Sequence, residues 1–456
     1  MPPPPTETSP LCDEDPHKSA NGNWLRTLRL VAISGAGLLA DGYDLQVVNL
    51  VMAIMQHVYG DKMGPAQKSL TATTTLVGVI IGQVSFGALA DVTGRKLASI
   101  ATAALTIVGA IISACVVDSP HMAISLQLAL CRLPLGLGVG GEYPLSAALG
   151  KEAEGKGLRL SRPQLLACNM LLYNMGAVLQ ASFVAVLLKA AVPLEVTWRL
   201  ALAGGAVPSI CVLVLRAFMD EPEARARERA EAAHGGGRAR GYFTNLAAQV
   251  ACRQSVLFGA CVSWFLFNFT AYGHGNFSSI ICDRLFGKNG DSAVALVMRD
   301  AIFALTISGL GVIGNLIGFL MAETVSLRMM QATCFVLMAV PLCIIGWLNG
   351  HVTSSGFLAV LYMFCVFMMP FIGITTYLVP TEHFPASARG TCVGIAAASG
   401  KLGGVVGTAL FPIWEARYGL SMVMVSSGIV SLLGAFTTVM FTPATRAEDA
   451  RAEKNH

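Results

Sequence analysis

Four ionisable side chains interrupt runs of the sequence that are otherwise apolar. Asp41 and Asp44 lie in the first run, Glu142 lies in a glycine-rich run, and Lys401 lies in a run of glycine and alanine nearer the C-terminus. A charge at membrane depth is costly unless it is paired, hydrated or directed at a ligand, so such residues usually mark a pathway for ions or substrate. The chemistry predicted by these four residues is binding of a charged solute and transfer of protons.

Asp41 and Asp44 are three residues apart, which places their side chains on adjoining positions of one helix face. The apolar run continues through residues 45–55, so a helix end between the two acids is a weak alternative explanation. We therefore expect both carboxylates to belong to an ion or substrate pathway within the membrane.

Glu142 and Tyr143 are the only ionisable side chains between residues 133 and 150. Four glycines precede them in the same run, and small residues allow neighbouring membrane helices to approach closely. An intramembrane acid should face a water-filled or ligand-filled interior, so we predict that Glu142 and Tyr143 both point into a polar cavity. The alternative is that the glycines serve packing and that Glu142 lies at a helix end among lipid headgroups.

A charged motif, GALADVTGRK at residues 87–96, follows the second apolar run. In a short turn, its acid and its basic residues can tie two helix ends together through ion pairs and helix-terminus interactions. A degraded copy, GFLMAETVSLR at residues 318–328, follows the eighth run. We predict a cytosolic gate that must open when the two halves of the chain rock. The predicted gate residues are Asp91, Gly94, Arg95 and Lys96.

The composition indicates a polytopic membrane protein. With 54% hydrophobic and only 13% charged residues, the chain of 456 residues has too little charge to cover a soluble globule. The net charge of +4 is small and gathers in loops, so no nucleic-acid partner is expected. The twelve cysteines contain no C-x-x-C pair, which argues against a disulfide framework or a zinc site. No Walker loop occurs, so we expect no enzyme activity, no metal and no cofactor, and energy from an ion gradient.

Twelve apolar runs are long enough to cross a bilayer at about 20 residues per crossing. Six precede and six follow an arginine-rich polar segment, and the repeated gate motif marks the two halves as repeats. The predicted fold is an all-α membrane protein of twelve transmembrane helices in two pseudo-symmetric six-helix halves. The predicted units are a disordered cytosolic tail at residues 1–25, an N-terminal half at 26–218, a cytosolic linker at 219–252, a C-terminal half at 253–441 and a cytosolic tail at 442–456.

The arginines of the linker place it in the cytosol by the positive-inside rule. An even number of crossings then places both termini in the cytosol as well. We expect a multi-pass protein of the plasma membrane rather than of an internal membrane, although the sequence carries no address that separates the two.

The G-x-x-x-D-x-x-G-R-K motif at residues 87–96 resembles that of the major facilitator superfamily. Four further stretches resemble the signatures of its phosphate:proton symporter family: DGYDLQVVNLV at 41–51, GVGGEYPLSAAL at 138–149, WFLFNFTAYG at 264–273 and PTEHFPASARGTCVGIAAASGKLGG at 380–404. Because these stretches fall in both halves, the resemblance covers nearly the whole membrane domain. It implies the major facilitator fold and transport by alternating access.

The resemblance also implies a phosphate site between the halves, formed by Tyr143, Trp264, Tyr272 and Lys401. Two neighbouring polar residues could add hydrogen-bond donors, which a phosphate needs in number together with a cation. The expected substrate-binding residues are Tyr143, Tyr173, Trp264, Asn268, Tyr272 and Lys401, and the expected proton carriers are Asp41, Asp44 and Glu142. Because Glu142 adjoins the proposed ligand Tyr143, it is predicted to be the principal coupling site.

This sequence departs from the symporter pattern at five positions. Glu142 stands where the family has an aspartate, which keeps the acid, and Asn268 stands where it has another aspartate, which loses it. Thr102, Tyr173 and Gly373 align with a glutamate, a glutamine and an asparagine of the family. These changes leave the substrate and the coupling ion open.

Some candidates have a structural alternative. Trp264 and Tyr272 fit packing or membrane-interface positions as well as they fit a ligand site, because aromatic residues are common in both places. His274 lies near a predicted helix end, where a solvated imidazole is expected.

The sequence predicts a secondary transporter that imports inorganic phosphate with protons across a lipid bilayer. One alternative is transport of another anion, such as an organophosphate or an organic acid. A second alternative, which the missing acids at Thr102 and Asn268 suggest, is a nutrient receptor that binds its substrate without moving it.

Overall fold

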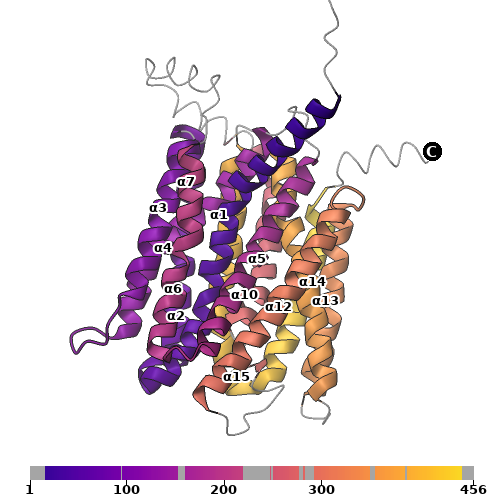
Figure 1. Cartoon of the computed structure of the whole chain (residues 1–456). Helices are drawn as coiled ribbons and strands as arrows, with labels where there is room; N and C mark the ends of the chain where they lie inside the picture. The colour runs from indigo at the N-terminus through magenta and orange to yellow at the C-terminus, as the bar shows by residue number, and fades with distance from the viewer. Residues whose placement is uncertain are drawn as a thin grey trace, which may run out of the picture.

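The computed structural model describes residues 16–93, 95–152, 160–218, 247, 250–276, 281–282, 292–349, 355–385 and 388–443. Within these ranges all regular structure is helical. The helices stand roughly side by side as one bundle, with α3, α4 and α7 at the left of Figure 1, α13 and α14 at the right, and α1 in the middle.

The first half contains seven α-helices, because the sixth crossing is divided into α6 and α7 at Gly205. The elements are α1 (Pro16–Tyr59), η1 (Gly60–Met63), α2 (Pro65–Thr93), α3 (Arg95–Ala114), α4 (Ile124–Glu152), α5 (Arg162–Lys189), α6 (Leu194–Gly204) and α7 (Ala206–Ala217). Helix α5 begins with a capping box in which Ser161 and Gln164 satisfy each other's backbone N–H groups.

The second half contains α10 (Gln254–Asn276), α12 (Ala293–Met321), α13 (Leu327–Leu348), α14 (Ser355–His383) and α15 (Arg389–Phe441). Helix α15 is 53 residues long and breaks at Gly419, whose φ of 77° suits glycine best. Because one crossing needs about 20 residues, α15 supplies two crossings. Ten other helical segments of the described chain are long and apolar enough to span a membrane, so twelve crossings result, as predicted.

Helix α1 differs from the prediction at its start. It begins at Pro16, so residues 16–25, which we predicted to be disordered, are helical. Once a helix has formed, adding a residue to it costs little, so the helix extends beyond the apolar run into polar sequence. The rest of that tail, the central part of the linker and most of the C-terminal tail lie outside the described residues.

The side chains are distributed as in a protein that spans a membrane. Large apolar residues such as Val207, Leu320 and Val360 are more than 60% exposed on the outside of the bundle. Charged residues are buried inside it, including Arg132 and Arg216 at no more than 1% exposure. Hydrocarbon can solvate exposed leucine and valine but not a charge, so the chain is an integral, multi-pass membrane protein.

The two halves meet along α2 and α15 and along α5 and α12. Glycine allows the first pair to approach closely: a Cβ on Gly394 of α15 would lie 2.6 Å from the carbonyl oxygen of Gln83 on α2. This close contact joins the last third of α2 to the start of α15, which are the parts of the two helices nearest the predicted gate.

The predicted gate is described only in part. Gly94 lies outside the described residues, as do the side chains of Asp91 and Arg95, and Lys96 stands in the first turn of α3. In the degraded copy, Glu323 accepts a hydrogen bond from Nε2 of Gln164 at 3.2 Å, which links the two halves. The gate itself stays a prediction.

Candidate functional site

A cavity of about 200 Å³ lies between the two halves. Residues of α1, α4 and α5 line it from the first half, and residues of α10, α12, α14 and α15 line it from the second. All six predicted substrate-binding residues are part of its wall: Tyr143, Tyr173, Trp264, Asn268, Tyr272 and Lys401. Pockets for drug-sized ligands usually exceed about 300 Å³, so this cavity suits a smaller solute.

Lys401 supplies the positive charge of the cavity. Its side chain is 3% exposed, and its Nζ donates a hydrogen bond to the hydroxyl of Tyr272. The same Nζ lies 4.5 Å from the ring centre of Tyr272 and 5.3 Å from that of Tyr143, within the range of cation–π attraction. Two aromatic rings and one hydroxyl therefore hold a buried ammonium group beside the cavity.

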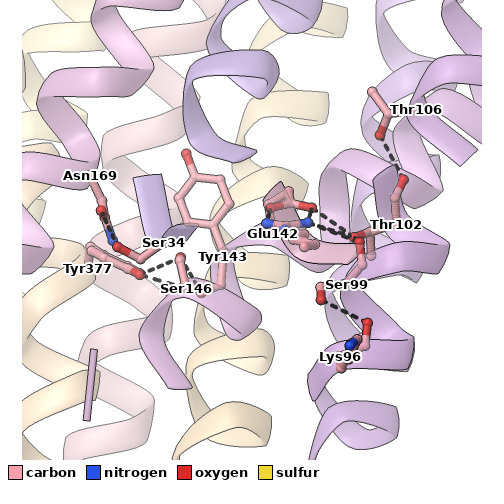
Figure 2. Close-up of polar contacts among 11 residues, drawn as sticks. Ser34, Lys96, Ser99, Thr102, Thr106, Glu142, Tyr143, Ser146, Asn169 and Tyr377 are labelled. Carbon is pink, nitrogen blue, oxygen red and sulfur yellow. Dashed lines mark hydrogen bonds and ion pairs between the residues drawn. The ribbon is translucent and has the colours of Figure 1, made fainter. Parts of the chain in front are cut away.

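Trp264 has both of the roles that the sequence analysis considered for it, lining of the ligand site and packing. It lines the cavity and also packs edge-on against Tyr143 and Tyr377, with ring centres 6.0 Å and 6.4 Å away. The Tyr377 hydroxyl lies 2.8 Å from Oγ of Ser146, so α14 of the second half is hydrogen-bonded to α4 of the first (Figure 2). The cluster therefore joins the wall of the cavity to a polar contact between the two halves.

Glu142 does not face the cavity, so this part of the prediction was wrong. Figure 2 shows its carboxylate directed toward Thr102, away from the ring of Tyr143. Thr102 Oγ1 donates to Glu142 Oε1 at 2.8 Å, and Nη1 of Arg216 donates to the same oxygen at 2.7 Å. Consecutive helix residues point about 100° apart, so Tyr143 can face the cavity while Glu142 faces Thr102 and Arg216.

Arg216 is the partner that the sequence analysis missed. Its second nitrogen, Nη2, pairs with Oε2 of Glu142, and its Nη1 also donates to the Ser99 carbonyl oxygen at 3.0 Å. The bidentate geometry is the strong form of an ion pair, and both side chains are almost fully buried. The sequence does contain a signal that could have identified this partner, because Arg216 directly follows the apolar residues VLVL of the sixth run.

Asp41 and Asp44 are 1% and 0% exposed, and neither lines the cavity. Oδ2 of Asp41 and both carboxyl oxygens of Asp44 accept no hydrogen bond from any part of the chain that the structure describes. Asp41 is near enough to Lys401, Glu142 and Arg216 to interact electrostatically with all three. It is therefore coupled both to the cavity cation and to the buried ion pair.

A second buried arginine accompanies Asp44. Nη2 of Arg132 donates to the backbone oxygen of Asp44, and its Nε lies 3.4 Å from Oγ1 of Thr75. The Asp44 carboxylate rests against Gly205, where a Cβ would lie 1.9 Å from Oδ1. The absence of a side chain at Gly205, between α6 and α7, therefore provides the space that this carboxylate occupies.

His274 is not solvated, contrary to expectation. It is 1% exposed, its Nε2 lies 3.1 Å from Oγ of Ser427, and its ring stacks on Tyr362 with centres 5.7 Å apart. The prediction failed because residues of α14 and α15 cover the end of α10. His274 also lines the cavity.

Two of the five departures from the symporter pattern lie in the cavity wall on the second half. Nδ2 of Asn268 is buried and has no hydrogen-bond partner among the described residues. Gly373 leaves open space, since a Cβ there would meet only the ring of Phe267, at 3.6 Å.

The fold and the cavity define a secondary transporter that carries a small solute across the membrane by way of a cavity between its two halves. The family described as "Sugar (and other) transporter" matches residues 29–451, and the chain belongs to this family of the major facilitator superfamily.

The curated relatives cover most of the chain. A probable inorganic phosphate transporter 1-10 of Oryza sativa is 29% identical over 91% of this chain and 87% of its own length. The inorganic phosphate transporter PHO84 of Saccharomyces cerevisiae is 27% identical over 92% and 83%. Glycerophosphoinositol permease 1 of Candida albicans is 26% identical over 95% and 82%.

Solved structures support the same fold. The proton:xylose symporter XylE bound to 6-bromo-6-deoxy-D-glucose superimposes with a TM-score of 0.73 at 18% identity, covering 93% of this chain and 98% of XylE. A partially occluded, inward-open form of XylE from E. coli gives 0.72 at 15% identity, over 92% and 98%. At this level of identity the likeness concerns the fold alone.

Proposed function

We propose that the chain imports inorganic phosphate together with protons, by alternating access, across the plasma membrane. The observation that carries the proposal is the buried Lys401 beside a cavity between the two halves. The curated relatives named as inorganic phosphate transporters support the same substrate. The chain then acts as a carrier and not as an enzyme.

The cavity wall near Lys401 offers the donors that an oxyanion needs. Tyr143, Tyr173, Tyr272 and Asn268, whose side chains all carry hydrogen-bond donors, line the same cavity as Lys401. Hydrogen bonds to a charged group are about twice as strong as neutral ones, and a low dielectric strengthens them further. A phosphate that enters would replace the Lys401–Tyr272 hydrogen bond with direct contact to both groups.

A coupling ion is required because the membrane is negative inside. Moving one negative charge inward against that potential costs about 2.3 kcal/mol per 100 mV, so cations must accompany the anion. We assign the protons to Asp41 and Asp44, whose buried carboxylates have oxygens without hydrogen-bond donors among the described residues. Glu142, which the sequence suggested as principal coupling site, has a permanent counter-charge in Arg216 and serves as a structural ion pair.

Asp41 and Lys401 provide a way to exchange charges during the cycle. When the cavity is empty, Lys401 is balanced by its electrostatic interaction with Asp41. When an anion binds Lys401, Asp41 loses part of that attraction and takes up a proton more readily. Substrate and proton then favour each other's binding, which is the thermodynamic requirement for symport.

The moving units that we propose are the two halves, residues 26–218 and 253–441, which rock about the cavity. The Ser146–Tyr377 contact and the Gln164–Glu323 contact both join the halves on the gate side. Both must break when the cavity opens to the cytosol, as must the predicted contacts of Asp91, Gly94, Arg95 and Lys96.

Uptake of labelled phosphate into proteoliposomes tests the proposal, with an inward proton gradient imposed. Wild type should accumulate phosphate, and Lys401→Gln should lower uptake at least tenfold, since a lost interaction with a charged ligand is worth about 1.5–3 kcal/mol. Leu402→Ala is the matched control, because Leu402 is 49% exposed on the lipid side. Equal uptake by wild type and Lys401→Gln would contradict the proposal, and labelled counterflow separates a transporter from a receptor that only binds.

A further inference from the structure

We propose that Gln83 of α2 weakens the contact between the two halves on the gate side, so that this contact can open during transport. The side-chain amide of Gln83 is buried where the halves meet and has no hydrogen-bond partner in the described chain. The inference concerns how the carrier moves, and it holds whichever solute is carried.

Gln83 lies where α2 of the first half packs against α15 of the second. A Cβ on Gly394 would lie 2.6 Å from the carbonyl oxygen of Gln83. One helical turn away, a Cβ on Gly87 would lie 3.2 Å from the carbonyl oxygen of Gly390. The two helix backbones therefore touch over at least one turn. We call this contact, formed by residues 83, 87, 390 and 394, the glycine seam.

The side chain of Gln83 projects toward the glycine seam. Residues four positions apart share one face of a helix, so Gln83 and Gly87 point to the same side of α2. A Cβ on Gly87 would meet Gly390 of α15 at 3.2 Å and the side chain of Pro144 of α4 at 3.6 Å. Gln83 is 0% exposed, whereas the next residue, Val84, is 48% exposed on the outside of the bundle.

Both polar atoms of the Gln83 amide, Nε2 and Oε1, are buried and have no hydrogen-bond partner among the described residues. The composition of the seam gives the reason. Gly87, Gly390 and Gly394 have no side chains that could donate or accept, and the side chain of Pro144 is apolar. The close approach that glycine allows thus leaves the amide without a side-chain partner while the seam is closed.

An unsatisfied amide affects the closed and the open seam differently. A buried amide without partners costs free energy, whereas an amide in contact with water is hydrogen-bonded. When the halves separate on the gate side, water reaches Gln83, so the amide destabilises only the closed state. The Ser146–Tyr377 and Gln164–Glu323 contacts stabilise that same state. Gln83 therefore offsets part of their effect and keeps both end states accessible.

Gln83→Met tests this role, because methionine has a similar length and no group that requires a hydrogen bond. The seam should then stay closed more of the time, by about fivefold or more, since the desolvation penalty of the amide is removed. Hydrogen–deuterium exchange of the full chain in lipid nanodiscs, without substrate, measures the opening. Backbone amides of residues 80–89 and 393–400 should exchange more slowly in the variant by that factor.

Thermal unfolding of the same samples identifies a variant that is merely damaged. Gln83→Met should unfold at the wild-type temperature or above it. Faster exchange at the seam together with a lower unfolding temperature would overturn the inference, because it would show that the amide is satisfied in the closed state. Unchanged exchange at the seam would overturn it as well.

Ser209→Ala is the matched control. Ser209 is 1% exposed and its Oγ has no partner among the described residues, but it lies in α7, which packs mainly on α1, α3 and α6 of its own half. Removing this hydroxyl should leave exchange at the glycine seam as in wild type. If Ser209→Ala slows that exchange as much as Gln83→Met does, the effect is a general stabilisation, and the role of Gln83 in opening is refuted.

Uptake of labelled phosphate connects the exchange result to transport. Gln83→Met should lower the maximal rate of uptake about fivefold, because opening on the gate side becomes slower or rarer. Slower exchange at the seam with an undiminished rate of uptake would show that Gln83 does not control the transport cycle. Absence of phosphate uptake in wild type would refute the proposed substrate, while the exchange measurement would still decide the role of Gln83.

Discussion

Asp41, Asp44 and Glu142 are buried acids of the first half, but their surroundings differ. Glu142 is held by a bidentate arginine and a threonine hydroxyl, whereas Asp41 and Asp44 have carboxyl oxygens with no hydrogen-bond donor in the described chain. A buried charge is costly unless it is paired and hydrogen-bonded, so the protein compensates a charge on Glu142 differently from a charge on Asp41 or Asp44. We therefore distinguish the proposed proton carriers by their partners rather than by their residue type.

Proton coupling gives a prediction at the level of single residues. Asp41→Asn should lower the number of protons taken up per phosphate, because the amide cannot take the proton that we assign to Asp41 and only Asp44 remains. Glu142→Gln should retain the proton-to-phosphate ratio of wild type, even if turnover falls. Vesicles that contain a pH-sensitive dye measure the ratio directly. A ratio that survives in Asp41→Asn but disappears in Glu142→Gln would return the coupling role to Glu142.

The buried ion pair predicts a stability effect. Arg216→Met leaves Glu142 as an uncompensated charge, which should lower the free energy of unfolding by about 3–5 kcal/mol. The double variant Glu142→Gln with Arg216→Met removes both charges and should recover most of that loss. Thermal unfolding in detergent compares the three proteins, and additive losses in the double variant would show that the two residues do not act as a pair.

Among the elements, the sixth crossing is divided into α6 and α7 next to the buried carboxylate of Asp44. Helices α6 and α7 meet at Gly205, and the Asp44 carboxylate of α1 occupies the space that a side chain would fill. Alanine is a better helix former than glycine, so a substitution here would favour an unbroken helix while removing room for the acid.

Gly205→Ala is therefore expected to displace Asp44 and to reduce uptake strongly, with a loss of stability of about 1–3 kcal/mol from overpacking. Gly309→Ala in α12 is the matched control, since a Cβ there would meet nothing within 4 Å. Uptake and thermal unfolding should both be measured. Equal losses of uptake and of thermal stability in Gly205→Ala and Gly309→Ala would show that Gly205 is not needed to make room for Asp44.

In the molecule as a whole, a few polar contacts across the halves accompany extensive apolar packing. The Tyr377 hydroxyl meets Ser146 of the opposite half (Figure 2), and its ring packs edge-on against Tyr143 with ring centres 5.9 Å apart. Such a contact exists in one end state of a rocking transporter and is lost in the other, so it biases the equilibrium between them.

Tyr377→Phe should shift that equilibrium toward the state open at the gate side. A lost hydrogen bond is worth about 1 kcal/mol, so the populations should change roughly fivefold. The measurement is the apparent affinity for phosphate from each side, in right-side-out and inside-out vesicles. Tyr418→Phe, at an exposed position in the break of α15, serves as control. Equal changes on both sides would mean that Tyr377 does not distinguish the two states.

The sequence by itself determined the membrane class, the number of crossings and much of the cavity wall. These depend on local properties: an apolar run of about 20 residues spans a bilayer wherever it occurs, and a lysine such as Lys401 within it must find a polar interior. Signature stretches added Tyr143, Trp264 and Tyr272, which do line the cavity.

Only the tertiary structure decided which charges meet. Glu142 and Arg216 are 74 positions apart, the Arg132 side chain reaches Asp44 across 88 positions, and His274 reaches Ser427 across 153. An apolar run shows that a helix crosses the membrane but leaves open how the helix is rotated about its axis, because lipid accepts any apolar face equally. That rotation follows from the packing of twelve crossings against one another, and it turned Tyr143 to the cavity and Glu142 to Arg216.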